Sequence, residues 1–209
     1  MNAGLELRNL QCYRGYRLLF NDLNAQAAPG QMLKVSGPNG AGKTSLLRLI
    51  CGLLAPARGQ VLWQGKKPAT LREEFGRQLV YIGHATATKN DLTVIEDLRS
   101  NAALGSGLAL SSHSAMGALQ GAALDQHAQT PVRLLSQGQR RRLALARLAA
   151  RQTSRLWVLD EPFTALDTMA TQWLSSLLLE HAHQGGVTVL TSHHHVPLDP
   201  YIEQVEVAL

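Results

Sequence analysis

The sequence predicts an α/β fold with a mostly parallel β-sheet, an antiparallel β layer and a small helical subdomain. Three observations support this fold class. Residues 37–44 fit the pattern G-x-x-x-x-G-K-S/T, an apolar strand at 156–159 ends in two acids, and residues 88–135 are rich in alanine, leucine and glycine. At 209 residues and 45% hydrophobic content, the chain is long enough to bury a substantial core in one domain.

The glycine-rich pattern lies between two predicted elements, a strand at residues 32–36 and a mostly apolar helix at residues 45–51. In that order the pattern binds phosphate, because its glycines let backbone N–H groups turn inward and the helix N-terminus adds partial positive charge. Lys43 is predicted to reach the β- and γ-phosphates, and the Thr44 hydroxyl to ligate Mg²⁺. The predicted nucleotide-binding residues here are Gly37, Pro38, Asn39, Gly40, Ala41, Gly42, Lys43, Thr44 and Ser45.

Short strands are predicted on both sides of this loop. Residues 5–10 alternate apolar and polar, and residues 61–65 read as a strand ending in a turn, which together suggest an antiparallel layer. Residues 79–82 form a buried type of strand that ends at Gly83 and His84.

The middle of the chain predicts helices. Thr93 and Glu96 have the spacing of a capping box that opens a helix, and residues 106–114, rich in glycine and serine, are expected to form a loop. We expect one domain over residues 1–209, with a core of residues 1–87 and 146–209 and a helical subdomain of residues 88–145.

The second half supplies polar residues at strand ends. Asp160 and Glu161 follow the strand at 156–159, so they should lie at the carboxyl edge of the sheet, where such sheets bind ligands. Asp160 is placed to hold Mg²⁺, and Glu161 to orient and deprotonate an attacking water. A strand at 187–192 delivers His193 to the same edge, where it could touch a γ-phosphate. Three adjacent histidines on an extended segment cannot all face one metal ion, so a metal site there is disfavoured.

Composition restricts the remaining possibilities. The net charge of +5 and pI near 9.6 come from charges spread along the chain, so the cluster Arg140-Arg141-Arg142 is interpreted as a solvated or interface face in preference to a nucleic-acid site. Cys12 and Cys51 belong to no C-x-x-C pair and are expected to be reduced and structural. With no apolar run near the roughly 20 residues of a membrane span and no signal-peptide pattern, we expect a cytoplasmic protein.

Together, the phosphate loop, the acid pair and the later histidine resemble an ABC-type ATPase subunit, and residues 135–139 complete the resemblance. Their sequence, L-S-Q-G-Q, looks like the ABC signature L-S-G-G-Q, with Gln137 in place of the first glycine. The resemblance implies a P-loop NTPase of ABC type with a RecA-like core, and a head-to-tail homodimer that binds two ATP molecules. The signature of each subunit would then meet the γ-phosphate of the other, and Asp167 would belong to the D-loop that crosses the interface. The signature residues are Ser136, Gln137, Gly138 and Gln139.

Further segments narrow the resemblance. Most ABC ATPases have a glutamine after the strand at 79–82, where this chain has His84. That residue, the strand at 61–65 and the sequences around residues 135–148 and 160–167 are similar to the CcmA family of bacterial cytochrome c maturation. The resemblance implies ATP and Mg²⁺ as cofactors, the membrane subunit CcmB with CcmC and CcmD as partners, and release of the haem-loaded chaperone CcmE as the outcome. It also implies a peripheral location on the cytoplasmic face of the inner membrane, with His84 coupling nucleotide state to the membrane subunit.

The residue that contacts adenine has two candidates. ABC ATPases usually stack an aromatic ring on adenine near the N-terminus, and here the candidates are Arg14, through its guanidinium, and the neighbouring Tyr13. For the role of the ATPase, transport of another cargo and a soluble ABC protein acting on nucleic acid or ribosomes are the alternatives, although the chain has neither the second ATPase module nor the coiled-coil insertion of the latter.

Overall fold

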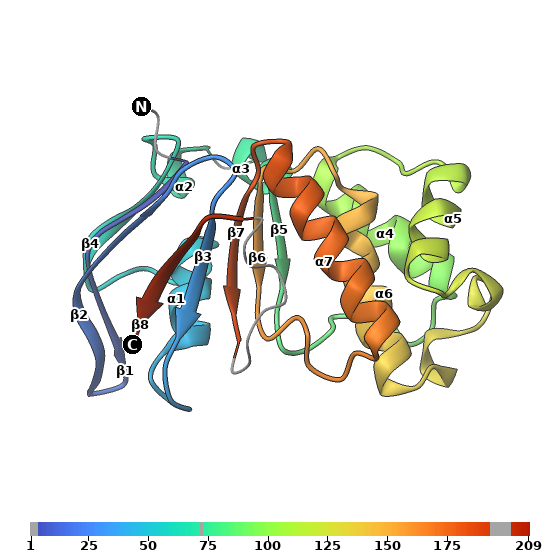
Figure 1. The fold of residues 1–209 in the computed structure, drawn as a ribbon, viewed down its shortest axis with the longest axis horizontal. Coiled ribbons are helices and arrows are strands. Elements are labelled where there is room, and N and C mark those ends of the chain that lie inside the picture. Colours follow the sequence, from blue (N-terminus) through green and yellow to red (C-terminus); the bar gives the residue numbers. More distant parts are fainter. Residues whose placement is uncertain (1–3, 72, 193–201) are drawn as a thin grey trace.

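The computed structural model describes residues 4–71, 73–192 and 202–209. Along the long axis of the molecule, an antiparallel sheet is followed by a parallel sheet and then by a group of helices (Figure 1). Helix α1 (Lys43–Ile50) lies between the two sheets, whereas α6 (Gln137–Ala150) and α7 (Thr168–His183) cover the opposite face of the parallel sheet. None of the helices described has both the length and the apolar character of a membrane span.

The antiparallel sheet has three strands in the order β2-β1-β4. They are β1 (Leu5–Arg14), β2 (Arg17–Ala27) and β4 (Arg58–Trp63). One face of β1 is buried against α1 through Leu5, Leu7, Leu10 and Cys12. Register shifts interrupt the β1–β2 ladder, and the last one lies between the pairs Cys12↔Phe20 and Tyr13↔Leu18, so that Leu19 has no directly opposed partner.

The parallel sheet has five strands in the order β5-β6-β7-β3-β8. They are β3 (Met32–Ser36), β5 (Leu79–Ile82), β6 (Leu156–Leu159), β7 (Val187–Thr191) and β8 (Gln204–Ala208). Every residue of β6 and β7 is buried, because helices cover both faces of the sheet. Since all five strands run in the same direction, the residues that follow β3, β5, β6 and β7 gather at one edge.

The helical group has its own apolar core, formed by α4 (Val94–Ser106), α5 (Ser112–Gly121) and α6. The predicted capping box is present, since the Thr93 side chain accepts the Glu96 N–H and the Glu96 carboxylate accepts the Thr93 N–H. The loop predicted over residues 106–114 is shorter in the structure, because Ser111 is the N-cap of α5. Its side chain accepts the Ser114 N–H. Serine therefore acts here as a helix N-cap as well as a loop former.

Short elements complete the chain. They are α2 (Pro68–Leu71), α3 (Glu73–Gln78) and two 3₁₀ turns, Asp125–His127 and Val132–Leu134.

A buried ion pair joins α4 to α6, with 3.4 Å between Asp97 Oδ2 and an Arg147 nitrogen. Asp97 Oδ1 also accepts the Lys89 N–H at 2.8 Å, and Arg147 donates to the Ala87 carbonyl at 3.0 Å. These bonds fasten the segment after β5, which contains His84, to the helical group.

Candidate nucleotide-binding site

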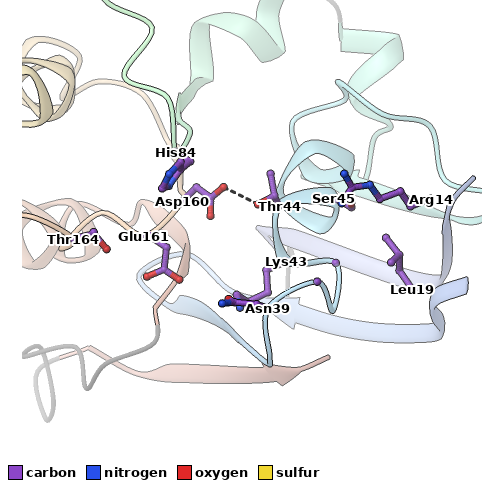
Figure 2. A pocket seen from close by; sticks show the side chains of 12 residues that line it. Arg14, Leu19, Asn39, Lys43, Thr44, Ser45, His84, Asp160, Glu161 and Thr164 are labelled. Atoms are coloured by element: carbon purple, nitrogen blue, oxygen red, sulfur yellow. Dashed lines mark hydrogen bonds between the residues drawn. The ribbon is translucent and has the colours of Figure 1, made fainter. Parts of the chain in front are cut away.

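A cleft of about 410 Å³ opens at the carboxyl edge of the parallel sheet. Figure 2 shows residues from the ends of β5 and β6 on one side, the loop after β3 in the middle, and the β1–β2 hairpin at the far end. Residues predicted from the ends of three different strands, among them Lys43, His84 and Asp160, therefore line one cleft. The lining residues are Arg14, Leu19, Asn39, Gly40, Gly42, Lys43, Thr44, Ser45, His84, Asp160, Glu161 and Thr164.

The loop after β3 is shaped around its own lysine. Lys43 Nζ donates to the Gly37 carbonyl at 2.7 Å and to the Pro38 carbonyl at 3.3 Å. Gly42 precedes α1 with φ at 113°, a conformation that favours glycine, and a Cβ built there would make a tight contact of 3.1 Å with Leu19 Cβ. The first turn of α1 has no acidic residue of its own, and the helix N-terminus presents partial positive charge to the cleft.

Opposite the loop, Asp160 is 3% exposed and held at both carboxylate oxygens. Thr44 Oγ1 donates to Asp160 Oδ2 at 2.9 Å (Figure 2), and Thr191 Oγ1 donates to Oδ1 at 2.8 Å. A hydroxyl and a carboxylate from opposite walls are thus adjacent. These oxygen donors fit Mg²⁺, which prefers oxygen ligands and takes few of them from the protein.

Glu161 follows with a left-handed backbone, at φ 50°, which turns the chain so that its side chain lines the cleft. Its backbone is fixed on both sides. The Glu161 N–H donates to Thr191 Oγ1 at 2.8 Å, and its carbonyl accepts an Arg141 guanidinium N–H at 2.7 Å. Thr191 was not predicted as a site residue, although a threonine at the end of an apolar strand beside the site is a signal that could have been used.

Arg141 corrects the interpretation of the arginine cluster as a solvated or interface face. The side chain is only 7% exposed, and it donates to the carbonyls of Gly83, Asp160 and Glu161 at 3.0, 2.8 and 2.7 Å. Burial lowers the pKa of the guanidinium, and the charges of Asp160 and Glu161 oppose that shift. The prediction was wrong for Arg141 because charge alone does not reveal carbonyl acceptors at strand ends; Arg140 and Arg142 are partly exposed.

The two candidates for the contact to the adenine of ATP differ in position. Arg14 lines the far end of the cleft together with Leu19 (Figure 2). Tyr13 does not line the cleft and is 46% exposed. Neighbouring residues of a strand point to opposite faces, so Arg14 and Tyr13 cannot both face the loop. Leu19, which the sequence did not predict, packs against Gly42 from the irregular part of the β1–β2 ladder.

The signature residues and the D-loop aspartate do not line this cleft. Ser136 caps α6, its Oγ accepting the Gln139 N–H at 3.2 Å while Gln139 Oε1 accepts the Ser136 N–H at 2.8 Å. Asp167 caps α7 by accepting the Ala170 N–H at 2.8 Å. Ser136 and Gln137 are exposed. His193 lies outside the described residues.

Comparisons with known proteins agree with this geometry. The family model described as "ABC transporter" matches residues 20–164. The chain is 47% identical to the "Cytochrome c biogenesis ATP-binding export protein CcmA" of Aromatoleum aromaticum over 90% of this chain and 88% of that one. It is 43% identical to the protein of the same name from Pseudomonas aeruginosa, over 93% and 95% of the two chains.

Among solved structures, an "ATP binding subunit of ABC transporter" superimposes with a TM-score of 0.84 at 26% identity, covering 97% of this chain and 85% of that one. The dimeric ATP-binding cassette MJ0796 bound to ADP and Pi gives a TM-score of 0.82 at 22% identity, with 97% and 94% covered, which supports the fold alone. On these similarities, the chain belongs to the CcmA family of ABC transporter ATP-binding proteins.

Proposed function

We propose that the protein is the ATP-hydrolysing subunit of an ABC complex that serves cytochrome c biogenesis, by driving haem export or release of the haem-loaded chaperone CcmE. The observation that carries the proposal is the single cleft in which the phosphate loop faces Asp160 and Glu161. Relatives named for cytochrome c biogenesis, matched over about nine-tenths of the chain, supply the biological context. The alternative is an ABC transport ATPase for another cargo.

In this proposal the loop residues 37–45 bind the phosphates of ATP through backbone N–H groups. Lys43 exchanges its bonds to the Gly37 and Pro38 carbonyls for bonds to the β- and γ-phosphates. Thr44 and Asp160 hold Mg²⁺, Asp160 directly or through water. When bound, the ion neutralises phosphate charge that develops during the reaction.

Glu161 is the proposed general base. Its carboxylate orients a water molecule in the cleft and accepts a proton from it as the water oxygen bonds to the γ-phosphorus. The bond from that phosphorus to the oxygen of ADP breaks, so the products are ADP and inorganic phosphate. The bonds from Thr191 and Arg141 to the Glu161 backbone support this role, because they hold the residue at the edge of the cleft. His193 is retained as a proposed contact to the γ-phosphate.

The signature residues require a second subunit. Ser136, Gln137, Gly138 and Gln139 lie at the N-terminus of α6, outside the cleft of their own chain, so we propose that they contact ATP bound by a partner in a head-to-tail homodimer. Asp167 lies at the start of α7 and is proposed to cross the same interface. Residues 88–145 then act as the subdomain that presents the signature.

The proposed partners are the membrane subunit CcmB with CcmC and CcmD, and indirectly CcmE, at the cytoplasmic face of the bacterial inner membrane. His84 is proposed to couple the nucleotide to the membrane subunit. Its place supports this role, since His84 lines the cleft while its segment is fastened to the helical group. Affinity capture from detergent-solubilised membranes tests the partners. A CcmB-like protein among those recovered supports the proposal, and an unrelated permease in its place would retain the ATPase and remove haem.

Glu161→Gln tests the hydrolytic reaction. The variant should bind ATP with unchanged affinity and trap the dimer, while turnover falls roughly 10²- to 10⁴-fold because the base is lost. Glu73→Gln is the matched control, since Glu73 is exposed on α3 and does not line the cleft. Phosphate release and size-exclusion chromatography with ATP measure both properties. Turnover within about twofold of the wild type in Glu161→Gln would exclude Glu161 as the base.

A further inference from the structure

Helix α6 connects two parts of the molecule that the proposed reaction uses. At its N-terminus, the exposed Ser136 begins the signature. A little over one turn later, Arg141 turns into the protein and reaches the carboxyl edge of the parallel sheet. One rigid helix therefore links the signature, outside the cleft, to the backbone of the cleft itself.

The contacts of Arg141 reach two separate segments of the chain. The guanidinium bonds the Gly83 carbonyl, directly before His84, and the carbonyls of Asp160 and Glu161. Two chain segments that follow different strands are thus held by one side chain. A guanidinium is planar and carries several N–H donors in fixed directions, so it sets the spacing and orientation of these carbonyls relative to one another.

Arg151, the residue that directly follows α6, gives a comparison. Arg151 donates to the carbonyls of Leu79, Gly76, Arg77 and Gly105 at 2.9–3.0 Å, so it also clamps backbone from several segments. Its acceptors lie in α3, at the first residue of β5 and in α4, and neither they nor Arg151 line the cleft. If these bonds to backbone carbonyls served only the fold, substitutions of Arg141 and Arg151 would have the same effect on ATP hydrolysis.

We propose that Arg141 is a positioning residue for ATP hydrolysis. It holds the Glu161 backbone and the His84 segment in fixed relation and transmits to both any shift of the signature end of α6. Contact between Ser136 and a partner's nucleotide would then change the position of Glu161 through the Arg141 side chain. The inference rests on the proposed function and adds a residue that determines the rate of hydrolysis without touching ATP.

Arg141→Lys and Arg151→Lys form the matched pair for the test, because both keep the positive charge and remove the planar guanidinium with its several N–H donors. We expect comparable losses of melting temperature in the full-length protein. In Arg141→Lys alone, kcat should fall roughly 10- to 100-fold while KM changes less than about threefold, because misplacement of the base by a fraction of an ångström slows only the chemical step. Affinity for a fluorescent ATP analogue, measured with Glu161→Gln present in both proteins, should stay within about twofold when Arg141→Lys is added.

The outcomes separate the two proposals. A wild-type protein that releases no phosphate from ATP, alone and in the membrane complex, would overturn the proposed function and this inference with it. A wild type that hydrolyses ATP, with equal kcat in Arg141→Lys and Arg151→Lys, would overturn the inference alone. The same holds if Arg141→Lys weakens ATP binding as much as it slows turnover. Arg141→Gln is the second variant, and failure of both to fold while Arg151→Lys folds would assign Arg141 to the fold and overturn the inference.

Discussion

Replacing Thr191 by valine should show how much the fold depends on one hydroxyl. The side chain is completely buried, donates to Asp160 Oδ1 and accepts the Glu161 N–H, both at 2.8 Å. Valine has nearly the same shape. It removes a hydrogen bond to a charged group, which contributes about 1.5–3 kcal/mol, and leaves the Glu161 N–H without an acceptor at a cost of about 1–3 kcal/mol. The extra methyl group returns up to about 0.8 kcal/mol, so the free energy of unfolding should fall by about 2–5 kcal/mol.

Urea unfolding of the full-length protein at pH 7 measures this change, and phosphate release measures its effect on turnover, which should fall roughly tenfold because Glu161 is no longer held. Thr191→Ser is the control. It keeps the hydroxyl and removes a methyl group, which should cost about 1 kcal/mol. If Thr191→Val is as stable as Thr191→Ser, or turns over ATP as fast as the wild type, the hydroxyl does not organise the two acids.

Two further predictions concern other parts of the molecule. Burial, with a smaller effect of Arg155, lowers the pKa of His181 from 6.5 to about 4, despite a hydrogen bond to the Val187 carbonyl. Since the unfolded chain takes up the proton first, the free energy of unfolding should drop by about 3 kcal/mol between pH ~6.5 and ~4. Urea titrations across that range should show a smaller drop in His181→Phe, and an equal drop would contradict the assignment. Arg14→Ala should raise KM for ATP roughly 2- to 5-fold, whereas Tyr13→Ala should not, and the reverse result would make Tyr13 the base contact.

Several elements of the fold could be predicted from the sequence because the signals are local. The strands at 32–36, 79–82 and 156–159 match the predicted bounds, since each is a short, mostly apolar segment followed by glycine or acidic residues. The start of α4 was predicted because Thr93 and Glu96 satisfy the chain within one turn. The phosphate loop is equally local, and six of its nine predicted residues line the cleft, whereas Gly37, Pro38 and Ala41 do not.

Other elements depend on distant contacts. No strand was predicted over β2 (Arg17–Ala27), whose alternation is broken by register shifts against β1, nor over β8, which is paired to β3 from far along the chain. The burial of Arg141 also escaped prediction, because its acceptors are carbonyls that every residue has. The chemistry of a side chain can be read from the residue type. Which backbone carbonyls form a binding site for an arginine depends on how the fold brings them together.

The left-handed backbone at Glu161 has a consequence for how this protein could evolve. A residue other than glycine in that conformation costs roughly 1–2 kcal/mol, so glycine or asparagine at this position would relax the turn. Variants selected for thermal stability alone should therefore replace glutamate at this position. Variants selected for growth that depends on ATP hydrolysis should keep it. At position 161, substitutions that stabilise the fold are therefore expected to abolish ATP hydrolysis. Sequencing position 161 in the survivors of the two selections would test this expectation.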